Sequence, residues 1–238
     1  MGLKEPGLRG SLRNVSVGIA AIPDSVLKQP WDEGEGTTVS DSSGNNDGTI
    51  DGANWVEDSE FEGGWKLNFD DEDKVDADNI LSELQDDEEY LIAITIEADE
   101  DSGRHTFIEQ SDNDTRDIAV GFFDGGDINT RSDHNTDSRR VTNGATTDRT
   151  RVAVYVNNDS TDDSNDETRI YLNGERADDA DGEDLVSTGG DTGLAFGGRT
   201  DNDSEGFSGD ADNPEIWHEP EDPDELAQLD YDAQEWSD

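Results

Sequence analysis

Two short carboxylate clusters have the composition of a cation site. Asp70, Asp71 and Asp73 follow an apolar stretch, and Asp210 and Asp212 form a second group. Hard cations such as calcium prefer clustered carboxylate and carbonyl oxygens, so these five residues are the candidate metal ligands and calcium is the candidate cofactor. The alternative is salt adaptation, because 63 Asp and Glu among 238 residues produce such clusters by chance.

No catalytic constellation stands out among so many carboxylates. Hydrolysis of a glycosidic bond needs two carboxylates that flank it. The nearest candidate, residues 97–101, runs into a Ser-Gly pair and is expected to form a hairpin turn. The three histidines, His105, His134 and His218, are scattered, and we expect them at polar surface positions. We therefore expect no enzymatic activity.

The charge of the chain restricts both its environment and its partners. The formal net charge is -47, the acidic residues run through nearly the whole sequence, and only four of the 16 basic residues are lysine. Such a chain repels itself in dilute buffer, whereas a Debye length of ~3 Å at ~1 M salt screens it, so we expect a protein of a halophile. The same charge argues against nucleic acid or an anionic membrane as a partner.

Neither a membrane span nor a secretion signal is expected. No run approaches the ~18–20 apolar residues of a span. The apolar stretch from Val15 to Ile22 is broken and does not have the pattern of a signal peptide, so we interpret the N-terminus as mature protein. The sequence has no cysteine, which excludes disulfides and thiolate metal sites.

The first 30 residues differ in charge from the remainder. Residues 1–30 carry a formal net charge of +2, and residues 31–238 carry one of -49. This break predicts an N-terminal arm over 1–30 and one domain over 31–238. The apolar content of the arm leaves two interpretations: a strand packed on its own domain, or an arm that docks onto an acidic neighbouring subunit. We favour the docking arm, which makes the protein a homo-oligomer.

From Trp31 onward the sequence has the pattern of an all-β protein. Short runs rich in β-branched and aromatic residues are separated by Gly, Asp, Asn and Ser, which predicts a sandwich or jelly roll. The expected strands cover residues 65–69, 91–96, 118–122, 152–156, 169–172, 194–196 and 215–217. Asn173-Gly174 is among the turn signals. One helix is expected over residues 222–229, with Asp222 as the N-cap and Pro223 at the first position.

The order of several motifs resembles a known family. The segments that carry the resemblance are DSSGNNDGTI (41–50), GWKLNFD (64–70), RVAVY (151–155), IYLNGE (170–175), FGGR (196–199) and FSGDAD (207–212). On these motifs residues 31–230 resemble the LamG-like jelly-roll domains of the concanavalin A-like lectin and glucanase superfamily. The resemblance implies a concanavalin A-like jelly-roll sandwich of antiparallel strands with a short C-terminal helix.

The resemblance also implies positions for the candidate metal ligands. The first three aspartates occupy the family's "FDG" loop and the last two lie near its "ID" strand, so the two groups could come close in the folded sandwich. The sequence departs from the family pattern at two places: Asp71 stands where the loop has glycine, and Thr150-Arg151 stand where a Trp-His pair is usual. Four of the five tryptophans are expected in the core, and Trp236 is expected to be exposed.

Together these features predict a non-enzymatic surface protein. An adhesion-type fold without a secretion signal fits a virion protein that assembles inside the cell. The leading hypothesis is a virion surface protein of a halophilic archaeal virus, such as a head turret, decoration or fibre component. It would contact other virion proteins through the arm and host surface glycans through its loops. The alternatives are a secreted or cell-surface carbohydrate-binding module of a haloarchaeon and a glycoside hydrolase.

Overall fold

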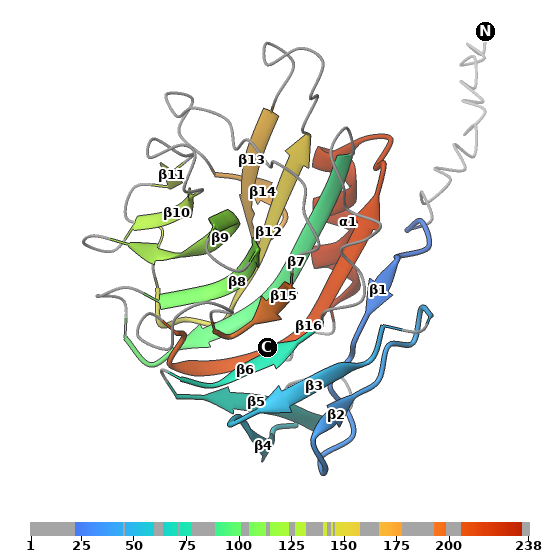
Figure 1. The fold of residues 1–238 in the computed structure, drawn as a ribbon. Helices are drawn as coiled ribbons and strands as arrows, with labels where there is room; N and C mark the ends of the chain where they lie inside the picture. Colours follow the sequence, from blue (N-terminus) through green and yellow to red (C-terminus); the bar gives the residue numbers. More distant parts are fainter. Residues whose placement is uncertain are drawn as a thin grey trace, which may run out of the picture.

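The strands of the computed structural model form two antiparallel sheets (Figure 1). The structure describes residues 22–44, 46–59, 64–70, 72–77, 89–100, 105–112, 115–123, 127–131, 140–141, 144, 146–157, 167–177, 193–198 and 206–234. Sheet A contains, in spatial order, β14 (Glu175–Arg176), β13 (Glu167–Leu172), β12 (Thr150–Asn157), β7 (Glu89–Ala98), β16 (Gly209–His218), β5 (Trp65–Phe69) and β4 (Asn54–Glu57), and β1 (Leu27–Lys28) also pairs with β16. Sheet B contains β11 (Arg140–Val141), β10 (Asp127–Arg131), β9 (Thr115–Phe123), β8 (His105–Asp112), β15 (Gly193–Phe196), β6 (Lys74–Asp76), β3 (Gly48–Asp51) and β2 (Thr38–Val39). The predicted all-β sandwich is confirmed.

The alternating pattern of each strand divides its residues between the core and the outer face. Ile92, Ile94 and Ile96 of β7 lie in the core that both sheets share, whereas Leu91 and Ala93 belong to a second cluster on the outer face of sheet A. An aromatic chain crosses the core. Trp31 contacts Phe69 of sheet A and Phe196 of sheet B, with ring centroids 5.8 and 6.4 Å apart. Trp31 is fully buried, and its contacts with both phenylalanines connect the two sheets.

The sandwich begins before residue 31. Leu27 pairs with Ile216 and Lys28 pairs with Glu215, so β1 extends sheet A from within the predicted arm. Leu27 is fully buried, and the Lys28 ammonium lies 3.3 Å from the Glu215 carboxylate. The structure therefore supports a strand packed on its own domain for the end of this segment. The prediction of a docking arm now concerns residues 1–21, which lie outside the described part of the chain.

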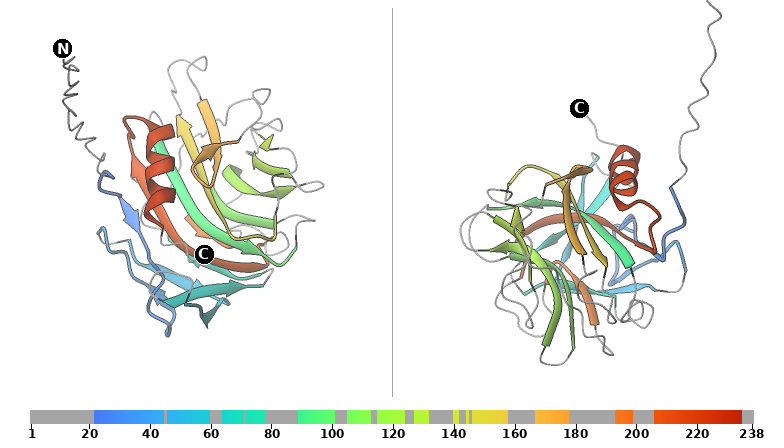
Figure 2. Two further views of the ribbon diagram at one scale, coloured as in Figure 1. Left: turned by 180° about the vertical axis from the view of Figure 1, so that it is seen from behind. Right: turned by 90° about the horizontal axis from the view of Figure 1, so that it is seen from above.

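Helix α1 (Pro223–Ala233) begins as predicted and runs past the expected end at residue 229. The Asp222 side chain accepts hydrogen bonds from the backbone N–H groups of Asp224 and Glu225, and Pro223 occupies the first turn. Leu226 and Ala227 pack onto the outer face of sheet A against Leu91, Ala93, Ala153, Tyr155, Tyr171 and Trp217. Figure 2 shows the helix against this sheet, away from sheet B. It is too short and too polar to cross a membrane, and the structure describes no other helix.

Two turn predictions have different outcomes. Asn173 and Gly174 have φ values of 52° and 80° and join β13 to β14, as a two-residue hairpin turn requires. The prediction of a hairpin at residues 97–101 is wrong, because β7 belongs to sheet A and β8 to sheet B. This segment leads from one sheet toward the other. Local turn residues cannot indicate which sheet the next strand joins.

Candidate functional site

A row of polar residues crosses the outer face of sheet B. Thr106 of β8 pairs with Gly121 of β9, and Gly121 pairs with Asn129 of β10. Residues that pair in this way share one face of a sheet. Their neighbours Ile108, Val120 and Ile128 lie in the hydrophobic core, so the row lies on the face opposite the core.

A second row runs parallel to the first and contains a carboxylate. Glu109 of β8 lies between Ala195 of β15 and Ala119 of β9, and Ala195 is paired in turn with Asp76 of β6. Small residues therefore separate the polar ones in both rows. We call Thr106, Glu109 and Asn129, with Ala119, Gly121 and Ala195 between them, the polar face.

The side chains of the polar face are buried although they lie outside the hydrophobic core. Thr106 and Glu109 are fully buried, and Asn129 is 8% exposed. Thr106 Oγ1 and Asn129 Oδ1 have no hydrogen-bond partner within the described part of the chain. An unpaired buried polar atom costs ~1–3 kcal/mol, so a site with two of them requires an explanation.

Gly121 is explained by packing rather than by a ligand. A β-carbon at this position would lie 2.1 Å from the backbone oxygen of His105. The close approach coincides with an irregular register of β8 between Thr106 and Ile108. The glycine therefore allows the strands to approach one another, and Thr106 and Asn129 flank a position without a side chain.

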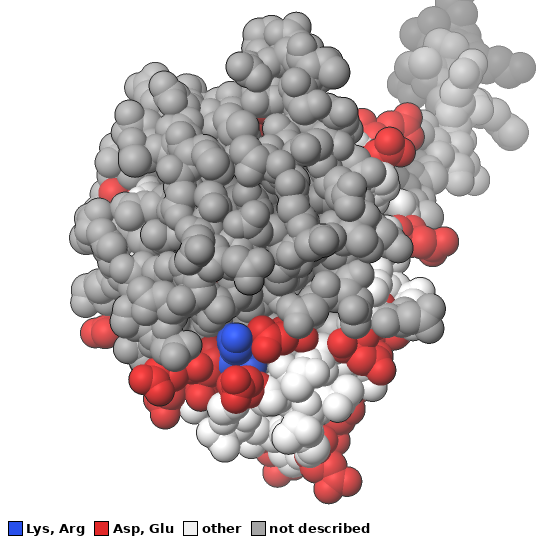
Figure 3. All heavy atoms as spheres, viewed as in Figure 1, with Lys and Arg blue, Asp and Glu red and all other residues white. Residues whose placement is uncertain are grey.

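The outer face of sheet B continues from the polar face toward exposed residues at the opposite edge of the sheet. Asp76 lies next to Lys74, with 3.3 Å between the ammonium nitrogen and the carboxylate oxygen. Thr49 and Thr38 extend the row across β3 and β2, and both are exposed. In Figure 3 the described residues in this view include many acidic side chains and few basic ones. The face thus combines a buried polar half with an exposed polar half.

This arrangement can bind a ligand that carries several hydroxyl groups. A threonine hydroxyl both donates and accepts, whereas an amide oxygen and an ionised carboxylate only accept. Sugar hydroxyls can supply both donors and acceptors. The chain carries a net charge of -47, so the chemistry favours a neutral or cationic ligand over an anionic one.

The structure shows the surroundings of four of the five candidate calcium ligands. Asp70 and Asp73 share one turn, in which the Asp70 backbone N–H donates to Asp73 Oδ2 at 2.8 Å. Asp210 and Asp212 lie on β16, where Asp212 is 1% exposed. Asp71 lies outside the described residues. Within the ranges that the structure describes, no group of three or more His, Asp or Glu side chains could hold a metal ion, so the calcium site remains a prediction.

An ammonium group occupies the space between carboxylates at Asp210. Lys66 Nζ lies 2.6 Å from Asp210 Oδ2 and 2.7 Å from Asp58 Oδ2, and Asn68 donates to the other oxygen of Asp210. Burial by itself lowers the pKa of Lys66, but hydrogen bonds and charge from Asp210 and Asp58 outweigh it and raise the pKa above its usual value. Lys66 thus brings a positive charge next to Asp210, one of the candidate calcium ligands.

Sequence reasoning misplaced or missed several side chains. His105 was expected at the surface but is 6% exposed and packs edge-on against Phe122. Trp31 and Trp217 are buried as expected, whereas Trp55 and Trp65 are only partly buried. Trp236 and His134 lie outside the described residues. Glu109 and Asn129 of the polar face carried no motif, and only strand register could have identified them.

Solved structures with similar folds include domains of carbohydrate-active proteins. No protein-family model and no curated protein sequence matches the chain. Domain 4 of AbnA, a GH43 extracellular arabinanase from Geobacillus stearothermophilus solved with arabinotriose, aligns with a TM-score of 0.64 and 15% identity, covering 87% of this chain and 97% of that one. The chain shares its fold.

Two further structures support the same architecture. The CBM40 of the Ruminococcus gnavus IT-sialidase aligns with a TM-score of 0.53 and 12% identity, covering 69% of this chain and 95% of that one. Trypanosoma rangeli sialidase aligns with a TM-score of 0.66 and 12% identity, covering 89% of this chain and 33% of that one. The chain therefore spans about a third of the sialidase. At such low identity these likenesses show a common β-sandwich fold.

Proposed function

We propose that this protein is a non-enzymatic carbohydrate-binding module and that the polar face of sheet B is its sugar site. The observation that carries the proposal is the pair of buried, unpartnered atoms, Thr106 Oγ1 and Asn129 Oδ1, in one row of the sheet. Buried polar groups in proteins are nearly always hydrogen-bonded, and sugar hydroxyls would satisfy both atoms. The solved domain bound to arabinotriose, which has the same fold, supports this ligand class.

Binding rather than hydrolysis is proposed because the described strands place alanines, Ala195 and Ala119, and not a second carboxylate, directly beside Glu109. Asp76 is the described carboxylate closest in register to Glu109, with only Ala195 between them. Asp76 pairs with Lys74, at 3.3 Å. A hydrolase needs one carboxylic acid to donate a proton while a second group acts as nucleophile or base.

The finer proposal is that the module belongs to the surface of a halophilic archaeal virion and contacts host glycans. The net charge of -47 fits a protein that folds in concentrated salt. Mass spectrometry of purified virions tests this location. Recovery from the envelope of uninfected cells would instead support the secreted or cell-surface module.

Binding to a glycan array in molar salt tests the sugar site. We expect wild-type protein to bind neutral or amino glycans, and Asn129→Ala and Glu109→Gln to bind at least ~10-fold more weakly. Asn54→Ala is the matched control, because Asn54 is exposed on the edge strand β4 of the other sheet. Equal binding by all variants would place the sugar elsewhere. Release of reducing sugar would show that the protein is a hydrolase.

A further inference from the structure

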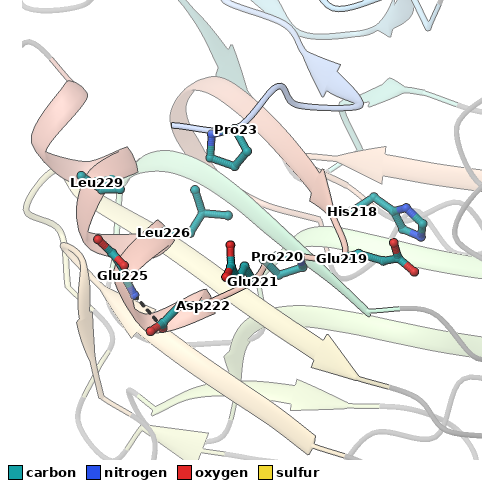
Figure 4. Close-up of a pocket in the computed structure, with 9 residues that line it drawn as sticks. All are labelled: Pro23, His218, Glu219, Pro220, Glu221, Asp222, Glu225, Leu226 and Leu229. Carbon is teal, nitrogen blue, oxygen red and sulfur yellow. Dashed lines mark hydrogen bonds between the residues drawn. The ribbon is translucent and has the colours of Figure 1, made fainter. Parts of the chain in front are cut away.

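A hollow of about 520 Å³ lies between helix α1 and the segment that leads into it from β16 (Figure 4). Leu226, Leu229 and Pro220 contribute apolar surface to the hollow, and Glu219, Glu221 and Glu225 contribute carboxylates. The side chains of these three glutamates are exposed and have no cationic partner within the described part of the chain. The hollow therefore offers both apolar surface and unpaired negative charge.

The described chain starts at the edge of this hollow. Pro23 contributes to its lining, and the preceding residue, Ile22, is 37% exposed. Residues 1–21 precede this point and carry Lys4, Arg9 and Arg13 against a single acid, Glu5. They are also rich in leucine, valine and isoleucine. Their composition complements the hollow in both charge and hydrophobicity.

We propose that residues 1–21 dock into the hollow of their own chain, with the basic side chains facing Glu219, Glu221 and Glu225 and the apolar ones facing Leu226 and Leu229. Attachment at Pro23 keeps the segment at a high local concentration near the hollow. Docking onto a second copy would cost the translational and rotational freedom of a second molecule. The same-chain contact avoids that cost and does not depend on sugar binding.

Hydrogen exchange of the full chain in molar salt, read by mass spectrometry, tests the contact. We expect amides of residues 2–21 to exchange about tenfold more slowly than an unstructured chain. The triple variant Glu219→Lys, Glu221→Lys and Glu225→Lys should lose this protection, and adding Lys4→Glu, Arg9→Glu and Arg13→Glu to it should restore part of the protection. The matched control reverses Glu35, Glu57 and Glu72, which are exposed elsewhere, and should leave the protection intact.

Amides of β7 and β16 report whether each variant is folded. The proposal would be overturned if the amides of residues 2–21 in the wild type exchanged as fast as those of an unstructured chain. It would also be overturned if their protection survived the charge reversal of the three glutamates. Light scattering distinguishes docking within one chain from docking between two copies. A monomer with protected residues supports docking within one chain, whereas protection that appears only in a dimer would overturn it in favour of a second copy.

Discussion

Arg151 on β12 and Asp230 on α1 form a two-pronged ion pair beneath the helix. The distances are 2.8 Å from Nε to Oδ2 and 2.9 Å from Nη2 to Oδ1. The two side chains are 1% and 2% exposed. Arg151 Nη1 also donates to the backbone oxygen of Asn213 at 2.6 Å. Arg151 belongs to one of the two departures from the family pattern, and its hydrogen bonds link α1 to sheet A.

Removing one partner of this pair should destabilise the protein strongly. Asp230→Ala leaves a buried guanidinium without its counterion, and we expect a loss of ~3–5 kcal/mol in the free energy of unfolding. The double variant Arg151→Met/Asp230→Leu should be less destabilised than either single change. Chemical denaturation in molar salt measures both. Asp232→Ala, an exposed position on the same helix, should change stability by less than ~0.5 kcal/mol; a loss as large as that of Asp230→Ala would contradict the special role of the pair.

Thr106→Val should separate stability from binding. Valine has nearly the shape of threonine and removes a buried hydroxyl that has no described partner. We therefore expect the unliganded protein to keep or gain stability, by up to ~1 kcal/mol, while sugar affinity falls. Thermal unfolding and the glycan array measure the two effects. A destabilised variant with normal binding would show that the hydroxyl has a structural role.

Replacing Lys66 should expose a latent cation site. Lys66→Met leaves the carboxylates of Asp58 and Asp210 without the ammonium that lies 2.7 and 2.6 Å from them. We expect millimolar calcium to raise the melting temperature of this variant but not that of the wild type. Differential scanning calorimetry with calcium and with a chelator tests this. Stabilisation of the wild type by calcium would instead support the metal site predicted from the aspartate clusters.

Glu215 should give the stability a measurable pH dependence. Burial raises the pKa of this carboxyl above its ordinary value of 4.5, although the charge of Lys28 opposes the shift. A folded-state pKa above that of the unfolded chain means that the folded protein holds the proton more tightly, so this group's contribution to stability falls as the pH rises above 4.5. Glu215→Gln should match the wild type below that pH and gain stability relative to it above. Parallel denaturation curves in salt measure the difference; a pH-independent difference would contradict the shift.

Lowering the salt concentration should unfold the protein. Screening of -47 charges weakens as the Debye length grows from ~3 Å at 1 M to ~10 Å at 0.1 M. We expect the β-type circular dichroism spectrum to be lost between molar and tens of millimolar sodium chloride. An unchanged spectrum at low salt would remove the main support for a halophilic origin.

Local patterns in the sequence were enough to predict the helix and seven of the strands, although not β8 or β10. Residues 65–69 alternate in polarity and form β5, and Asp222-Pro223 begins α1. Each of these signals depends on neighbours within a few residues, so it can be read without knowing the fold. Net charge is a sum over the chain and is likewise fixed by the sequence.

Only the tertiary structure decided which distant residues meet. Arg151 and Asp230 lie 79 positions apart, and Leu27 pairs with Ile216, a contact that moved the start of the sandwich into the predicted arm. The row of Thr106, Gly121 and Asn129 depends on the register of three strands and on one irregularity in β8. A shift of one residue would turn each side chain to the opposite face, so no local pattern could have shown that these polar groups lie together. Nor could a local pattern have shown that the Lys66 ammonium lies 2.6 Å from the Asp210 carboxylate.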